Sequence, residues 1–176
     1  MSTDEQRETR FTAWMTEFRG VMLKIARAYA RGDADQADLF QEMALQVWLS
    51  LPAFRERASP LTWLYRVCLN TAMTWRRGTL RRERPILPGA NPGDVSAPAA
   101  SPADNAGQRE LLEKLYAAIQ AMPDFERALV LLMLDGLAYR EIAEVTGLTE
   151  NHVGVALTRA RKRLAELMKG VTDELE

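Results

Sequence analysis

The sequence predicts an all-α protein of two small helical domains joined by a flexible Pro/Ala-rich linker, with the second domain ending in a helix-turn-helix. Apolar residues recur at helical spacing in both halves of the chain, without convincing strand alternation. Five of the eight prolines lie within residues 85–107, where neither helix nor strand is expected. We therefore expect domains at residues 1–84 and 108–176, with the linker between them.

The first domain is predicted to contain two informative helices. Apolar positions from Leu39 to Leu51 recur every three or four residues, which gives one helix an apolar side and a polar side. Pro52 is expected to end this helix. A second helix begins with Ser59 as N-cap and Pro60 as its first residue.

The second domain is predicted to begin with two apolar helices. The first helix ends before Pro123, and the second runs near residues 125–134 and ends at Gly136, a usual C-terminal residue. The apolar stripe of the first helix consists of Leu111, Leu112, Leu115 and Ile119.

The following segment has the spacing of a helix-turn-helix. A short helix through Ile142 and Val145 is broken by Gly147, and Thr149 is suited to cap the next helix. In such a motif the second helix enters the major groove of DNA. Its outward positions are expected to be Asn151, Val155, Thr158, Arg159 and Lys162. An ordinary helical hairpin with a basic C-terminal half is the simpler alternative.

Charge is strongly segregated along the chain, although the net charge is only −1. Residues 33–42 are acidic without a basic residue, whereas residues 76–84 contain five arginines. Residues 159–163 are also basic. This pattern indicates an acidic surface for one partner and basic surfaces for another, with ordinary solvated helix surface as the alternative.

The helix that begins at Pro60 carries the groups of a single-stranded DNA site. Arg66, Asn70, Met73 and Arg77 share one side, with Trp63 beside them. Cations hold phosphates, an amide can contact a base edge, and an aromatic ring can stack on a base. Tryptophans at helical spacing usually belong to the core, and we expect this of Trp63 and Trp75.

Phe54 lies in a polar loop, where its burial is less easily explained. Its neighbours Arg55 and Arg57 are cationic, so the ring could stack on an extruded base.

Other function classes find little support. The longest apolar run is far shorter than the roughly 20 residues that span a bilayer, and the polar N-terminus lacks a secretory signal. A single cysteine, Cys68, excludes an internal disulfide and suits a reducing cytoplasm. With one histidine as well, no metal site is expected. No catalytic motif or phosphate-binding loop is present, so we expect a cytoplasmic, non-enzymatic protein without a cofactor.

Three motifs, taken in order, resemble the extracytoplasmic-function sigma factors of bacterial RNA polymerase, over residues 18–82 and 111–169. Residues 35–42, Asp-Gln-Ala-Asp-Leu-Phe-Gln-Glu, are similar to the family's Asp-Ala-Glu-Asp-Leu-Val-Gln-Glu motif, which faces the polymerase clamp helices. Ala37 replaces an acidic residue of that motif. The resemblance implies that Asp35, Asp38, Gln41 and Glu42 bind polymerase.

The other two motifs imply DNA contacts. Residues 54–70 look like the promoter-melting region, in which Phe54 would line the pocket for a flipped base of the minus-ten element and Asn70 would contact its neighbour. Residues 136–143 are similar to the family's Gly-Leu-Ser-Tyr-Glu-Glu-Ile-Ala signature. With the charge pattern, the expected DNA-binding residues are Phe54, Arg55, Trp63, Arg66, Asn70, Arg76, Arg77, Tyr139, Glu150, Asn151, His152, Val155, Thr158, Arg159 and Lys162.

The recognition helix departs from the family. Many members carry Val-Lys-Ser-Arg-Leu where this chain has Val-Gly-Val-Ala-Leu at residues 153–157. Upstream specificity is therefore expected to rest on Glu150, Asn151, His152 and Thr158, with Val155 available for a thymine methyl. Phosphate contacts are expected from Arg159, Arg161, Lys162 and Arg163.

The resemblance implies a protein that directs core RNA polymerase to promoter DNA, with no membrane insertion. Many relatives are also held inactive by an anti-sigma factor. The alternative is a stand-alone helix-turn-helix regulator with a helical sensing domain. That alternative explains the second domain but not the acidic motif followed by an Arg/Asn helix.

Overall fold

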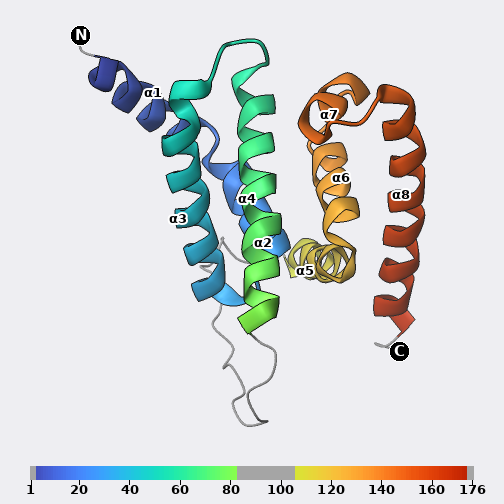
Figure 1. The fold of residues 1–176 in the computed structure, drawn as a ribbon. Coiled ribbons are helices and arrows are strands. Elements are labelled where there is room, and N and C mark those ends of the chain that lie inside the picture. The colour runs from blue at the N-terminus through green and yellow to red at the C-terminus, as the bar shows by residue number, and fades with distance from the viewer. Residues whose placement is uncertain (1–2, 83–105, 174–176) are drawn as a thin grey trace. The chain divides into compact units, whose positions relative to one another are not determined.

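The computed structural model describes residues 3–82 and 106–173, which form helices joined by short turns (Figure 1). These residues contain no strand, so the predicted all-α fold is confirmed. The chain divides into two compact units, Met1–Ser96 and Ala97–Glu176. Most of the predicted linker, residues 85–107, lies outside the described residues. Residues 106 and 107 were wrongly assigned to the linker, because they belong to a helix.

The first unit is built on three packed helices, α2 (Arg19–Tyr29), α3 (Gly32–Ser50) and α4 (Pro60–Arg82). Helix α1 (Thr3–Glu17) lies against α2, α3 and the short 3-10 turn η1 (Leu51–Ala53). Pro52 lies in this turn, directly after the end of α3, as predicted. The fully buried core includes Met22, Ile25, Leu39, Met43, Val47, Leu64, Cys68 and Ala72.

The start of α4 follows the prediction. Pro60 is its first residue, and the hydroxyl of Ser59 accepts the backbone N–H of Thr62 at 3.1 Å. This bond satisfies one of the amide groups that a helix leaves without a partner in its first turn. The start of α4 is thereby fixed beside the loop that contains Phe54.

The second unit packs α8 (Glu150–Asp173) against α5 (Ala106–Ala121), α6 (Asp124–Leu134) and α7 (Tyr139–Thr146). The apolar stripe predicted for α5 is only partly core. Ile119 is buried, whereas Leu111 and Leu112 are 60% and 43% exposed. The helical period predicted the spacing of this stripe. It could not show which part of α5 the other helices cover. The core includes Ile119, Met122, Leu129, Leu132, Ile142, Val153, Leu157 and Ala160.

A buried arginine joins α5 to α6. The side chain of Arg127 is fully buried, and its guanidinium donates hydrogen bonds to the backbone carbonyls of Gln120 and Met122. These carbonyls lie at the end of α5, where helix carbonyls lack partners and carry partial negative charge. Arg127 therefore caps α5 from inside the core, a role that the sequence analysis missed.

The helix-turn-helix has the predicted local geometry. Gly147 ends α7 with φ +77°, a left-handed conformation that glycine adopts at little cost, and its N–H donates to the Ala143 carbonyl at 2.8 Å. The Thr149 hydroxyl accepts the N–H of His152 at 3.3 Å and caps α8. At the start of α7, the Glu141 carboxylate accepts the N–H of Ala138 at 2.8 Å.

Candidate nucleic-acid interface

Helix α4 presents its predicted polar face to solvent. Arg66, Asn70 and Arg77 are exposed, while Arg76 is half-buried. Within the part of the chain that the structure describes, Arg66 and Asn70 have no hydrogen-bond or ion-pair partner. The Arg77 Nε donates to the carbonyl of Met73 at 3.2 Å, which holds that guanidinium along the helix. The two central side chains of this face are therefore available to a ligand.

Asn70 also lines a hollow between α3 and α4, and the structure places Glu42 in the same hollow. Glu42 accepts a hydrogen bond from the Gln46 amide at 3.0 Å. The acidic motif and the Arg/Asn helix thus meet at one site, although the sequence assigned them to different partners. The other lining residues are Gln46, Thr71, Thr74, Trp75 and Gly78.

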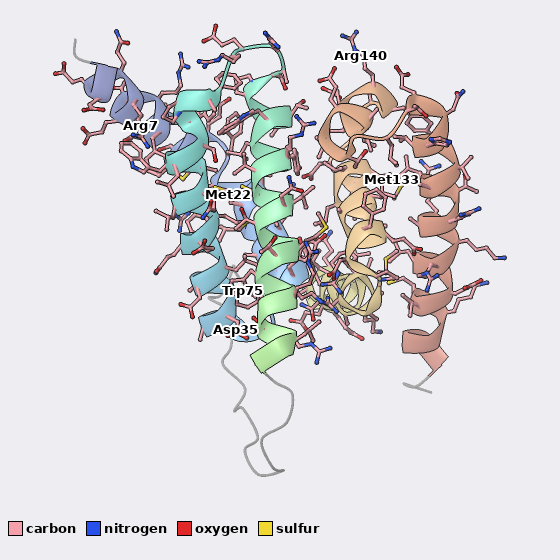
Figure 2. The ribbon with its side chains drawn as sticks, in the orientation of Figure 1. Arg7, Met22, Asp35, Trp75, Met133 and Arg140 are labelled. Carbon is pink, nitrogen blue, oxygen red and sulfur yellow. The ribbon has the colours of Figure 1, made fainter. Side chains whose placement is uncertain are left out.

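Trp75 is half-buried in this hollow, so its assignment to the core was wrong. Figure 2 shows Trp75 of α4 and Asp35 of α3 toward the same end of the two antiparallel helices. This arrangement follows from the turn between the helices, which brings the start of α3 beside the second half of α4.

The acidic face of α3 is divided between solvent and α4. Asp38 and Gln41 are exposed, whereas Asp35 and Glu42 are half-buried. The exposed stripe continues along α3 at four-residue spacing through Leu45 and Leu49, which are 49% and 56% exposed. These two leucines were missed as surface residues. Their spacing from Gln41 is the sequence signal that places them on the same face.

Phe54 is less isolated than the sequence indicated. Its half-buried ring lies 5.1 Å from the ring of Trp14 and 5.4 Å from that of Trp63 between centroids, and the two tryptophan rings are 5.6 Å apart. Trp63 is itself half-buried, so its assignment to the core was also wrong. The three rings form an aromatic cluster at the start of α4. Beside them, Arg55 is exposed and donates to the Pro52 carbonyl at 3.4 Å.

On α8, apolar and polar faces separate as predicted. Val153, Leu157 and Ala160 are buried. The exposed side chains are Glu150, Asn151, His152, Val155, Thr158, Arg159 and Lys162. The Thr158 hydroxyl donates to the backbone carbonyl of Gly154 at 2.9 Å, so its proton is already engaged. Tyr139 of α7, 43% exposed, reaches the same surface and lies against Gly154.

The basic run of α8 is less available than expected. The Nε of Arg163 forms an ion pair with the Glu126 carboxylate of α6 at 2.7 Å, and the Nε of Arg161 lies 2.9 Å from the sulfur of Met133. Both contacts engage the Nε atoms with α6, and phosphate contacts from the other guanidinium N–H groups of these exposed arginines stay a prediction. Arg159 and Lys162 have no partner among the described residues.

The single cysteine of the chain, Cys68, lies in the core of the first unit. Burial raises the pKa of the Cys68 thiol to about 12, so this sulfur stays protonated inside the core. No group of three or more His, Cys, Asp or Glu side chains in the described ranges could hold a metal ion. Among the same residues, no helix is long and apolar enough to cross a membrane.

Two family comparisons match the two units. Residues 14–82 match "Sigma-70 region 2", and residues 112–164 match "Sigma-70, region 4". These ranges agree closely with the predicted resemblance. The helical unit with the Asp38 and Asn70 faces is thus a sigma region 2, and the helix-turn-helix unit is a sigma region 4.

Relatives with similar sequences indicate which class of sigma factor this chain resembles. The ECF RNA polymerase sigma factor SigG of Mycobacterium tuberculosis is 29% identical over 97% of this chain and 52% of the relative. The ECF RNA polymerase sigma-E factor of Escherichia coli is 28% identical over 74% of this chain and 72% of the relative. The chain spans about half the length of SigG. With both sigma-70 regions present, this chain belongs to the extracytoplasmic-function sigma factors.

Solved structures share the fold. CnrH, in complex with the cytosolic domain of CnrY, superposes with a TM-score of 0.65 at 18% identity, over 93% of this chain and 90% of that one. RpoE from Bartonella quintana, in complex with the anti-sigma factor NepR, superposes with a TM-score of 0.68 at 18% identity, over 91% of this chain and 97% of that one. At this identity the likeness concerns the fold alone.

Proposed function

We propose that this chain binds core RNA polymerase and directs it to promoter DNA, acting in the cytoplasm by binding rather than by catalysis. In this mechanism α3 docks on the polymerase through Asp35, Asp38, Gln41 and Glu42. The helix-turn-helix holds upstream duplex DNA, and the α4 face captures bases of the minus-ten element as the duplex opens.

The observation that carries the proposal is the α4 face in the first unit. Arg66 and Asn70 lie exposed with no partner among the described residues, on the helix whose first turns carry Trp63 of the aromatic cluster. A cation, an amide and a stackable ring are the groups that hold an unpaired base and its phosphate. Unstacking a base costs a few kcal/mol, and stacking on an aromatic ring offsets about 1–3 kcal/mol of that cost.

Upstream recognition is proposed for the outward face of α8 and for Tyr139. We assign base-edge contacts to Asn151 and His152, and phosphate contacts to Arg159 and Lys162, because all four side chains are exposed on this face. Val155 is 54% exposed and can touch a thymine methyl. The same face offers Glu150 and Thr158 as further polar contacts.

Run-off transcription with purified core polymerase tests this function. The chain should cause initiation from a subset of genomic promoters, and core polymerase alone should not initiate at them. A stand-alone regulator would instead protect an operator from nuclease without polymerase and would give no promoter-specific transcript. That second outcome would reject the sigma function.

We further propose an anti-sigma factor as a regulatory partner. Of the two similar folds, RpoE was solved with the anti-sigma factor NepR, and CnrH was solved with the cytosolic domain of CnrY. Exposed apolar residues such as Leu111 and Leu112 would suit a partner that covers α5. If so, Leu111→Asp should reduce copurification of an inhibitory protein from native cells. Equal recovery with wild type and variant would exclude α5 from that interface.

A further inference from the structure

Helix α1 reaches the loop that carries Phe54 and contacts it at three points. The Arg10 guanidinium pairs with the Glu56 carboxylate at 3.1 Å. The same guanidinium lies 5.8 Å from the centroid of the Phe54 ring. One turn further along α1, the ring of Trp14 lies 5.1 Å from that of Phe54, at an interplanar angle of 79°. Edge-to-face geometry of this kind is favourable between aromatic rings.

Helix α1 is itself fixed at the end of α3. The Arg7 guanidinium lies 3.9 Å from the centroid of the Trp48 ring, and it donates a hydrogen bond to the Trp48 carbonyl. Phe11 packs edge-on against the same ring at 5.3 Å. Figure 2 shows Arg7 on α1 beside α3. Because Arg7 and Phe11 hold α1 against α3, α1 can act as a fixed support for the loop that carries Phe54.

The loop needs such a support. Glu56 has φ +56°, which makes it the one residue other than glycine with positive φ in the described part of the chain. A side chain disfavours this left-handed conformation, so the surrounding structure must hold it. Arg10 bonds directly to the Glu56 side chain, and both groups are largely exposed. The pair is therefore weak alone, and it acts together with the Trp14–Phe54 contact.

We propose that Arg10 and Trp14 are positioning residues for base capture. They hold the loop so that the Phe54 ring is placed to stack on an extruded base of the promoter. The inference rests on the proposed function of Phe54 and adds α1 to that site. The match to sigma-70 region 2 begins at residue 14, so Arg7, Arg10 and Phe11 precede the matched segment.

Charge variants of the Arg10–Glu56 ion pair distinguish an effect on the position of the Phe54 loop from a general effect on DNA binding. Glu56→Gln removes the ion pair but makes the loop more positive, which favours DNA by simple electrostatics. Holoenzyme with this variant should still open the promoter more slowly, by about two- to fivefold, as expected for an exposed pair. Arg10→Glu should be slower still, and Arg10→Glu combined with Glu56→Arg should recover most of the rate.

The rate of opening is measured at saturating holoenzyme, from the fluorescence of 2-aminopurine placed in the minus-ten element. Core-polymerase affinity and thermal unfolding of Glu56→Gln and Arg10→Glu should equal those of wild type. Trp14→Leu should slow opening by about two- to tenfold, the worth of an aromatic pair, and Trp14→Phe should restore it. If Trp14→Leu also lowers the unfolding temperature, its effect on opening is no test of positioning, and the Arg10 and Glu56 variants alone test it.

Phe54→Ala distinguishes the positioning role of α1 from the proposed base capture by Phe54. If Phe54→Ala slows opening while the Arg10 and Glu56 variants open at the wild-type rate, the role of α1 is overturned and the capture site stands. If the swapped pair stays as slow as Arg10→Glu, positioning is also overturned. If Phe54→Ala opens normally, the capture site fails and the inference fails with it.

Discussion

The ring of Tyr139 on α7 lies over Gly154 of α8, where an added Cβ would meet the Tyr139 Cε2 at 3.5 Å. This distance is ordinary van der Waals contact, and Gly154 has no left-handed backbone conformation. Nothing in the backbone or in the space around it therefore requires glycine. Glycine within a helix is roughly 0.5–1 kcal/mol less favourable than alanine, because it loses more chain entropy on folding.

Gly154→Ala should accordingly raise the free energy of unfolding of the second unit by about 0.5–1 kcal/mol. Urea denaturation followed by circular dichroism measures this change. Gly170→Ala is the matched control in the same helix, because its Cβ would meet nothing within 4 Å. A loss of stability at Gly154 alone would mean that Tyr139 cannot accommodate a methyl group.

Local signals in the sequence predicted much of the fold. The caps at Ser59 and Thr149 and the end of a helix at Gly147 depend on neighbouring residues, and the structure has all three. The two-sided patterns of α4 and α8 also follow from helical period alone. The predicted outward residues of α8 are all exposed, as are Arg66, Asn70 and Arg77 of α4, whereas Met73 is half-buried.

Tertiary contacts were not predictable in this way. Trp14 meets Phe54 across 40 positions of sequence, and Arg163 turns to Glu126 of another helix. Neither pairing has a periodic signal, because each depends on how separate helices pack. For the same reason, the predicted apolar stripe of α5 did not indicate that Leu111 and Leu112 would be 60% and 43% exposed.

The buried Arg127 should be essential to the second unit. Arg127→Met keeps an apolar side chain but removes the donors that cap the carbonyls of Gln120 and Met122. The free energy of unfolding should fall by about 1–3 kcal/mol, the cost of leaving buried polar groups unpaired. Arg109→Met is the control, since the Arg109–Glu113 pair lies on the surface. Equal effects in urea denaturation would contradict the capping role.

Arg159 and Lys162 of α8 should act on DNA phosphates, because neither has a partner among the described residues. Arg159→Ala and Lys162→Ala should each lower promoter affinity at all upstream sequences. Each lost contact should reduce the slope of log affinity against log salt by roughly 0.9. Arg163→Ala is the matched control, because its guanidinium is bound to Glu126 at 2.7 Å. A reduced slope for Arg163 but not for Arg159 would place the DNA on another face of the helix.

Asp38 should contribute to polymerase binding, because it is exposed and has no partner among the described residues. Asp38→Lys should weaken core binding by about five- to thirtyfold at low salt, since it replaces attraction by repulsion. The difference should shrink at high ionic strength, where exposed charges are screened. Glu17→Lys changes the charge equally on α1 and should bind core as wild type does. Equal binding by Asp38→Lys in fluorescence anisotropy would exclude this face.

Asn70 provides the sharpest test of the site between α3 and α4. Its amide is exposed at the edge of the hollow that Glu42 and Gln46 line from α3. If the amide contacts a base, Asn70→Ala should slow promoter opening by about five- to a hundredfold, the worth of a good base-edge contact. Core affinity should be unchanged, because the base is exposed only after polymerase has bound.

Two further variants separate base contact from a general effect on the hollow. Asn70→Asp keeps the shape of the side chain but replaces its donor by a second acceptor, so it should be at least as slow as Asn70→Ala if a base acceptor is contacted. Gln46→Ala removes an amide from the opposite wall, where the side chain already bonds to Glu42. It should open the promoter at the wild-type rate. Equal slowing by Gln46→Ala would show that the hollow acts through its shape, and a normal rate for Asn70→Ala would place base capture elsewhere on α4.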